Sequence, residues 1–180
     1  MILPPRQHLI LVRPMAREST PLPPKLMRAL RRSVEAHFSP DATSFSSHLE
    51  RLSPSLYGFL TDHAVVTVGV YHGHFPAVCA KLRKRQSSDT LGVADGQDIG
   101  LANIIAFTDP SAPVRSFPEE YWTEASLDAE VRILAGELVR YGRPFLTDAN
   151  ADWNGLRSYI DQQMRKALEE APWLRKYQKA

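Results

Sequence analysis

The sequence predicts an α+β fold in which helices pack against an antiparallel β-sheet within a single domain. Three observations favour this class: one strongly β-prone central segment, a set of amphipathic helical segments, and several short strand-like segments close together in the chain. A chain of 180 residues, 43% of them hydrophobic, is long enough to bury the core of one such domain. We expect an irregular proline-rich arm over residues 1–24, the domain over residues 25–172 and a basic tail over residues 173–180.

The central strand of the predicted sheet covers residues 64–71, with the sequence AVVTVGVY. β-branched and aromatic side chains fill this segment, and they suit the pleated surface of a sheet. Because side chains alternate across a strand, they divide into Val66, Val68 and Val70 on one face and Val65, Thr67 and Tyr71 on the other. Both sets contain apolar groups, so both faces of the sheet need cover.

Shorter strands are expected beside this central strand. Residues 45–51, 56–60 and 101–107 have strand-like patterns, while residues 77–84 fit either a short helix or an extended return strand. Neighbouring strands joined by short turns favour an antiparallel meander. The Ser, Asp and Gly residues within 85–100 indicate a mobile loop.

The first helix is expected to begin at Pro23 and Pro24, since the first helical turn tolerates proline. Its apolar residues recur every four positions, at Leu26, Leu30, Val34 and Phe38. Pro40 is expected to end this helix, because proline lacks the N–H group that continues the helical hydrogen bonds.

Two further helices are predicted in the second half of the chain. Residues 127–141 carry an apolar stripe, with Ser126 as the N-cap, Gly142 in the left-handed conformation at the end and Pro144 blocking continuation. Residues 152–170 carry a second stripe. Together with the first helix, these segments supply cover for the sheet.

The charge and the cysteine content limit the classes of protein. The formal net charge of +2 is too small to indicate a nucleic-acid partner. Basic residues concentrate in the first 35 positions and acidic residues over 119–130, which form either solvated surface or sites for a charged partner. Apolar runs near the start are too short for a signal segment or a membrane span, and a single cysteine, Cys79, fits a reducing compartment. We expect a cytoplasmic protein without a membrane association.

One cluster has residues that can bind a metal ion. His72 and His74 lie two apart, as residues on one face of a strand do, and His63 and Cys79 lie nearby in sequence. No HExxH or CxxC motif completes a ligand set, so we interpret the histidines as polar groups at a strand end and Cys79, between Val78 and Ala80, as a buried structural residue. No cofactor is expected. A metal-dependent or thiol enzyme centred on His72, His74 and Cys79 is an alternative hypothesis.

Asp148, Asn150 and Asp152 alternate like the start of a calcium-binding loop. The motif fails, because Trp153 occupies the position of the required glycine and Tyr159 that of the bidentate glutamate. We interpret these residues as caps of the last helix.

Nucleic-acid binding is a third hypothesis. The basic residues available for phosphate contacts are Arg28, Arg31 and Arg32 in the first helix and Lys81, Arg83, Lys84 and Arg85 before the loop. No phosphate-binding glycine motif is present, and no aromatic residues alternate with these cations to stack on bases.

Two segments carry a resemblance to a known family. The sequence VTVGVYHGHFPAV is similar to the "FxVNLGVY…P" strand and turn of a bacterial family, the domain of unknown function numbered 4304. Later, Trp122, a helix, and Tyr141 to Leu146 in the pattern "YGxPFL" follow in the family's order. The resemblance covers residues 25–160 in order of elements, but the chain lacks the family's Asn before Leu-Gly and its Arg-rich strand near residues 101–107.

The resemblance implies a compact domain of helices on an antiparallel sheet, without recognised catalytic residues. It also implies similarity to small bacterial immunity proteins, which block a cognate toxin by covering it. The leading hypothesis is therefore a non-enzymatic interaction protein with a toxin or effector as its protein partner. Acidic and aromatic side chains steer and anchor protein partners, and the predicted partner-binding residues are Glu119, Glu120, Tyr121, Trp122, Glu124 and Asp128.

Overall fold

The computed structural model describes residues 22–72, 76–86, 89–92, 97–113 and 122–171. Its centre is a five-stranded antiparallel sheet in the order β1-β2-β3-β4-β5. The strands are β1 (Glu50–Ser53), β2 (Leu56–Leu60), β3 (Ala64–His72), β4 (Pro76–Lys84) and β5 (Ile99–Gly100). Each strand pairs with the next one in sequence, which confirms the predicted α+β class and the meander.

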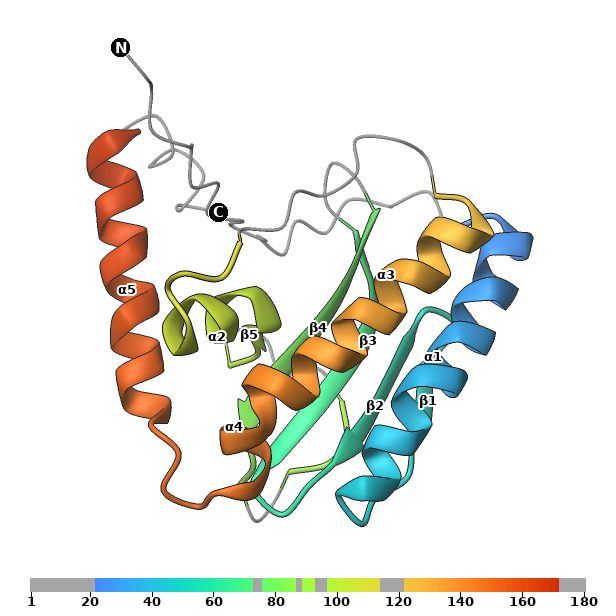
Figure 1. Cartoon of the computed structure of the whole chain (residues 1–180), viewed down its shortest axis with the longest axis horizontal. Coiled ribbons are helices and arrows are strands. Elements are labelled where there is room, and N and C mark those ends of the chain that lie inside the picture. The colour runs from blue at the N-terminus through green and yellow to red at the C-terminus, as the bar shows by residue number, and fades with distance from the viewer. Residues whose placement is uncertain (1–21, 73–75, 87–88, 93–96, 114–121, 172–180) are drawn as a thin grey trace.

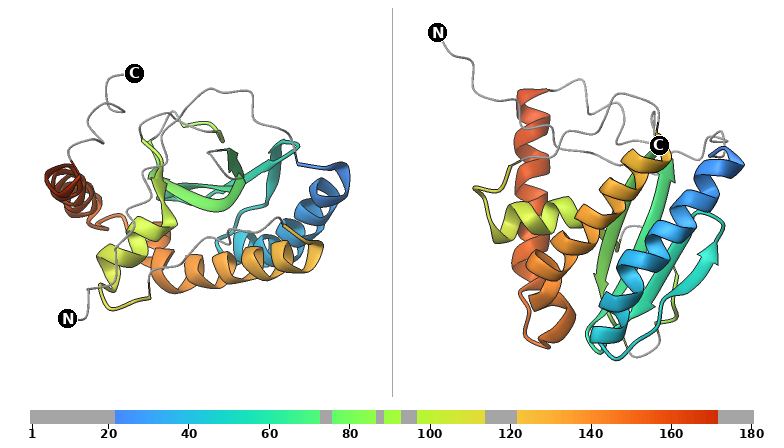
Figure 2. Two further views of the ribbon diagram at one scale, coloured as in Figure 1. Left: turned by 90° about the horizontal axis from the view of Figure 1, so that it is seen from above. Right: turned by 45° about the vertical axis from the view of Figure 1, so that its right-hand side comes forward.

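The helices lie along one face and one edge of this sheet. They are α1 (Pro24–Ser44), α2 (Leu101–Thr108), α3 (Glu124–Glu137), α4 (Arg143–Thr147) and α5 (Trp153–Glu170), and a π-helical turn η1 (Leu138–Gly142) joins α3 to α4. α1 and α3 lie side by side across the sheet, and α5 stands beyond α2 at the edge of the molecule (Figure 1). Seen from above, both α1 and α3 are on the same side of the sheet (Figure 2).

The main core lies between the sheet and these two helices. Val66 in β3 pairs with Phe59 in β2 and with Leu82 in β4, so that three buried side chains lie in a row on one face. The predicted stripe of α1 packs on this face through Leu30, Val34 and Phe38, and α3 adds Leu127 and Val131. Burial of such side chains contributes about 1.5–3 kcal/mol each, so this layer is the main source of stability.

The second face of the sheet is also covered, as predicted. Val65 and Thr67 are each only 1% exposed on this face, while the side chain of Tyr71 lies outside the described residues. Leu52 and Leu91 lie over Gly58, which pairs with Thr67. The cover on this side therefore includes parts of a loop, whereas helices cover the other side.

The prediction of a strand over residues 101–107 was wrong, because this segment forms α2. Its buried residues Leu101, Ile104 and Ile105 have the i, i+3, i+4 spacing of a helix face. A short apolar run has no clear period, so the sequence pattern did not separate a buried helix from a buried strand. Residues 77–84, which fitted either a helix or a strand, lie within β4.

The first helix passes Pro40 and ends at Ser44, so the predicted stop at Pro40 was wrong. The strand predicted over residues 45–51 begins only at Glu50 and runs to Ser53 as β1. The Ser47 amide donates to the Ala42 carbonyl at 2.9 Å and the Ser46 amide to the Thr43 carbonyl at 3.0 Å. These two bonds form a Schellman motif, in which Ser46 takes the left-handed position with φ of 57°. The carbonyls of Ala42 and Thr43 thus have hydrogen-bond partners at the end of α1. The helix ends at this motif, four residues after Pro40.

The helix predicted over residues 127–141 also has different ends. Thr123 is the N-cap, and Ser126 is its partner in a capping box at the third helical position. Gly142 is right-handed, with φ of −80°, and the chain continues into α4. A regular α-helix would press the Pro144 ring against the Arg140 carbonyl, and the wide turn η1 lies directly before this proline.

The last helix agrees with the prediction for residues 152–170. Asp152 is its N-cap, and the Asp152 carboxylate accepts a hydrogen bond from the Gly155 amide at 2.8 Å. The Asp148 carboxylate accepts from the Asn150 amide at 2.8 Å within the preceding turn. The interpretation of Asp152 as a helix cap is confirmed.

Candidate partner-binding groove

The predicted partner-binding residues fall partly within the described structure. Glu119, Glu120 and Tyr121 lie outside the described residues. Trp122 is half-buried and packs against the core, and Glu124 begins α3. The Glu124 carboxylate lies 2.9 Å from Lys25 and 2.8 Å from Arg32.

These contacts change the electrostatics of Glu124. The hydrogen bond from Lys25, followed by the charges of Lys25 and Arg32, holds the pKa of the Glu124 carboxyl below its usual value. The carboxylate therefore bridges the start of α3 to two cations of α1. Its role in binding a partner remains a prediction.

Asp128 makes a second bridge between the same helices. Its Oδ1 accepts a hydrogen bond from the Ser33 hydroxyl at 2.6 Å and lies 3.2 Å from Nε2 of His37. The Ser33 hydrogen bond, with a smaller contribution from His37, lowers the pKa of the Asp128 carboxyl. Both described carboxylates of the predicted acidic set thus join α3 to α1 while remaining partly exposed.

The basic residues proposed for phosphate contacts do not form one surface. Arg31 pairs with Glu35 at 2.8 Å and Arg32 with Glu124. Along β4 the side chains alternate between the faces of the sheet, and Arg83 is only 4% exposed. The Arg85 guanidinium donates to the Thr61 carbonyl at 2.6 Å. The cation of Arg83 is used inside the protein, which weakens the nucleic-acid hypothesis.

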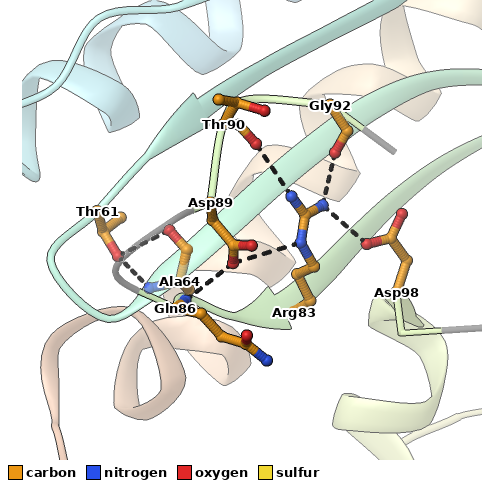
Figure 3. A network of polar contacts seen from close by, with 8 residues as sticks. All are labelled: Thr61, Ala64, Arg83, Gln86, Asp89, Thr90, Gly92 and Asp98. Carbon is orange, nitrogen blue, oxygen red and sulfur yellow. Dashed lines mark hydrogen bonds and ion pairs between the residues drawn. The ribbon is translucent and has the colours of Figure 1, made fainter. Parts of the chain in front are cut away.

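Arg83 instead binds the loop that follows it (Figure 3). Its guanidinium donates to the carbonyls of Gly92 at 2.5 Å and Thr90 at 3.1 Å, and to the Asp98 carboxylate at 3.2 Å. The Asp89 carboxylate lies 3.7 Å from Nε and also accepts from the Gln86 amide at 2.8 Å. The described parts of the predicted mobile loop are therefore held around a buried cation.

The candidate metal and thiol residues remain untested as a site. His74 and the side chain of His72 lie outside the described residues. Cys79 is partly exposed in β4, opposite Gly69 of β3, so the interpretation of Cys79 as a buried residue was wrong. Among the residues whose placement is described, no group of three or more His, Cys, Asp or Glu side chains could hold a metal ion.

The structure contains a groove that the sequence analysis did not predict. It lies between α2, the turn after α2, and the helix formed by α3 and η1, and it has a volume of about 410 Å³. The described residues that line it are Ile105, Ala112, Pro113, Ile133, Gly136, Glu137, Arg140 and Tyr141. These residues come from segments far apart in the sequence, so only the packed fold brings them together.

Ile133 and Gly136 make the apolar part of the groove accessible. Ile133 is 45% exposed, and within the described part of the chain it is the large hydrophobic side chain that stays exposed. It falls outside the inward stripe of α3, whose members include Val131 and Leu134. A Cβ atom on Gly136 would meet no atom within 4 Å, so the missing side chain leaves open space one turn along the helix.

The widened turn η1 carries the polar end of the groove. The Arg140 guanidinium lies 5.0 Å from the centroid of the Tyr141 ring, in a cation–π contact. Arg140 also contributes to the lowered pKa of Asp109, although hydrogen bonding from the Ser111 hydroxyl is the larger cause. Among the described residues, no carboxylate lies within ion-pair distance of Arg140. π-helical turns occur often at functional sites.

A signal for this groove was present in the sequence but weak. Ile133 is an apolar residue outside the apolar stripe of an otherwise regular amphipathic helix. Single exposed apolar residues are common, so this one pointed to a binding surface only after the groove around it was known.

Comparison of the chain with protein-family models, curated proteins and solved structures gives no match. The resemblance to the domain of unknown function 4304 therefore remains a prediction. No helix in the described part of the chain is long and apolar enough to cross a membrane. The fold and the site define an α+β domain with an open, mainly apolar groove beside a cation.

Proposed function

We propose that this protein is a cytoplasmic, non-enzymatic bacterial interaction protein, which covers the active surface of a toxin or effector in the manner of an immunity protein. The single observation that supports this function is the exposed Ile133 within the groove. An apolar side chain that becomes buried against a partner contributes to binding, and a few well-packed contacts supply most of the affinity of a protein–protein interface.

The surroundings of the groove fit this role. Glu124 and Asp128, two of the residues predicted to bind a partner, lie in the first half of α3, and later residues of the same helix line the groove. An inhibitor that acts by occlusion needs a shaped surface and charge complementarity, and it needs no catalytic group. The ion pairs and hydrogen bonds between α1 and α3 fix the start of α3, the helix that carries Ile133 and Gly136 at its other end.

The test is co-expression of the chain with the products of its flanking genes. We expect one product to co-purify with the wild-type protein and to be toxic when expressed without it. Ile133→Asp should weaken the complex at least tenfold, because it places a charge where an apolar anchor packs. Since Ile133 is exposed, the variant should retain the wild-type circular dichroism spectrum.

Ala36→Leu is the matched control, since it changes an exposed alanine of α1 outside the groove and outside the predicted partner-binding residues. It should leave the complex unchanged. The proposal is overturned when no flanking product binds the wild-type chain, or when a bound product retains its full toxic activity in the complex.

A further inference from the structure

We infer, on the basis of this proposed function, that the groove recognises a protein segment with one large apolar side chain and a neighbouring carboxylate. The apolar side chain would enter the hollow between Ile105, Ile133 and Gly136, and the carboxylate would bind Arg140. This inference names the chemistry of the partner, which the proposed function leaves open.

The apolar half follows from the lining and size of the groove. Ile105, Ala112, Pro113 and Ile133 present hydrocarbon to it, and the space above Gly136 is open. A volume of about 410 Å³ lies in the range of sites that hold a small organic ligand, about 300–1,000 Å³. One leucine-sized or aromatic side chain, with the backbone that carries it, fits such a space and would shield Ile133 from water.

The charged half follows from Arg140. Its guanidinium is held on the Tyr141 ring, and it has no carboxylate at ion-pair distance among the described residues. An arginine in this position can donate two parallel hydrogen bonds to a carboxylate with little loss of side-chain freedom. The structure therefore presents a preorganised donor at one end of the apolar hollow.

The order of Gly136 and Arg140 along the helix sets the direction of the bound segment. Gly136 lies one turn before Arg140, and Tyr141 follows Arg140 in η1. The segment therefore places its acidic residue at the Tyr141 end of the groove and its apolar residue toward Gly136.

The experiment is a selection of displayed random peptides against the wild-type protein, followed by affinity measurements on the enriched peptides. We expect the enriched peptides to share a large apolar residue with an Asp or Glu within about four positions, the reach of one helical turn. Gly136→Leu should weaken their binding at least tenfold by filling the groove. The variant should fold, because leucine favours a helix more than glycine does.

A double-mutant cycle tests the charge contact. Arg140→Gln should weaken an acid-bearing peptide about tenfold, as expected for loss of a charge-assisted hydrogen bond, and should have no effect on the same peptide with its acid replaced by the amide. Ala125→Leu, which adds the same leucine far from the groove on the same helix, should bind every peptide as the wild type does.

Three outcomes overturn the inference. In the first, Gly136→Leu binds all selected peptides as the wild type does, and in the second, the enriched peptides carry no Asp or Glu. In the third outcome, the losses of affinity caused by Arg140→Gln and by the peptide amide simply add. A flanking-gene partner that binds Gly136→Leu and Arg140→Gln normally also overturns it but leaves the proposed function standing. If acid-bearing peptides are selected but no flanking-gene product binds, the inference about the groove stands and the proposed toxin-blocking function fails.

Discussion

Val65 and Arg83 face each other across strands β3 and β4, so a buried valine and a buried guanidinium share the second face of the sheet. The apolar surface around Val65 must be shielded from water. Arg83 contributes to this by binding the carbonyls of Thr90 and Gly92, which holds their loop against the sheet. Two carboxylates, Asp89 and Asp98, balance the buried charge. A polar side chain thus fastens loop segments over an apolar surface.

Arg83→Ala should lower the free energy of unfolding by about 3–5 kcal/mol, because it removes the buried cation that donates to Asp98 and to the carbonyls of Thr90 and Gly92. Arg83→Met should cost less, since it keeps the hydrocarbon packing of the side chain. Urea denaturation measures both. Lys84→Ala, on the exposed neighbour, should change stability by no more than about 0.5 kcal/mol, and an equally small effect of Arg83→Ala would contradict the role of Arg83.

Asp41 should make stability depend on pH in an unusual direction. Its Oδ2 is buried without a hydrogen-bond partner among the described residues, and burial, partly opposed by His37, raises the pKa of Asp41 to about 6. Its folded pKa exceeds the unfolded value of about 3.9, so the folded protein binds more protons between these values. This contribution is therefore favourable at low pH and is lost as the pH rises through about 6.

Asp41→Asn removes this dependence. The full shift in pKa corresponds to about 3 kcal/mol, and partial exposure to solvent reduces the expected effect to about 1 kcal/mol. We expect urea denaturation at pH 7.5 to show a more stable variant, and at pH 4.5 a smaller difference. Asp62→Asn, at an exposed position, is the control, and a constant difference between wild type and Asp41→Asn at both pH values would contradict the prediction.

The left-handed residue Ser46 offers a stabilising substitution. A side chain in this conformation costs about 1–2 kcal/mol, which glycine avoids at some cost in entropy of the unfolded chain. Ser46→Gly should therefore raise the free energy of unfolding by about 0.5–1 kcal/mol, measured by thermal or urea denaturation. Ser47→Gly, next to it and without a positive φ, should be neutral or destabilising, and a gain at both positions would argue against the Schellman geometry.

Two glycines should respond in opposite ways to the same substitution. A Cβ atom on Gly69 would overlap the Ser55 carbonyl oxygen and lie 2.9 Å from the Leu56 Cα, so Gly69→Ala should cost about 3 kcal/mol. Gly136→Ala meets open space in a helix and should stabilise the protein by about 0.5–1 kcal/mol. Thermal unfolding of the two variants compares them directly, and a similar loss in both would refute the close approach at Gly69.

Elements with a long, clear period were predicted correctly. The stripe at Leu30, Val34 and Phe38 identified α1, the run around Val68 identified β3, and Asp152 identified the start of α5. Errors arose where a residue expected to end an element was accommodated by a change in the neighbouring backbone. Pro144 does not end its helix, because the wide turn η1 makes room for the ring.

Predictions about the site were limited for another reason. Glu124 and Asp128 were predicted from composition, and the structure adds that they also join α3 to α1. The groove itself depends on Ile105 and Arg140, which belong to different helices. Nothing local to either residue in the chain indicates that the two lie on one surface.

The sequence by itself determined the β-rich centre, the amphipathic helices and the need to cover both faces of the sheet, because hydrophobic period and β-branching act over a few neighbouring residues. Only the tertiary structure decided that residues 101–108 form a helix, that Arg83 is buried, and that Ile133 and Arg140 share an open groove. These features depend on which distant side chains complete a packing surface or satisfy a charge, and such pairings are made only when the chain is folded.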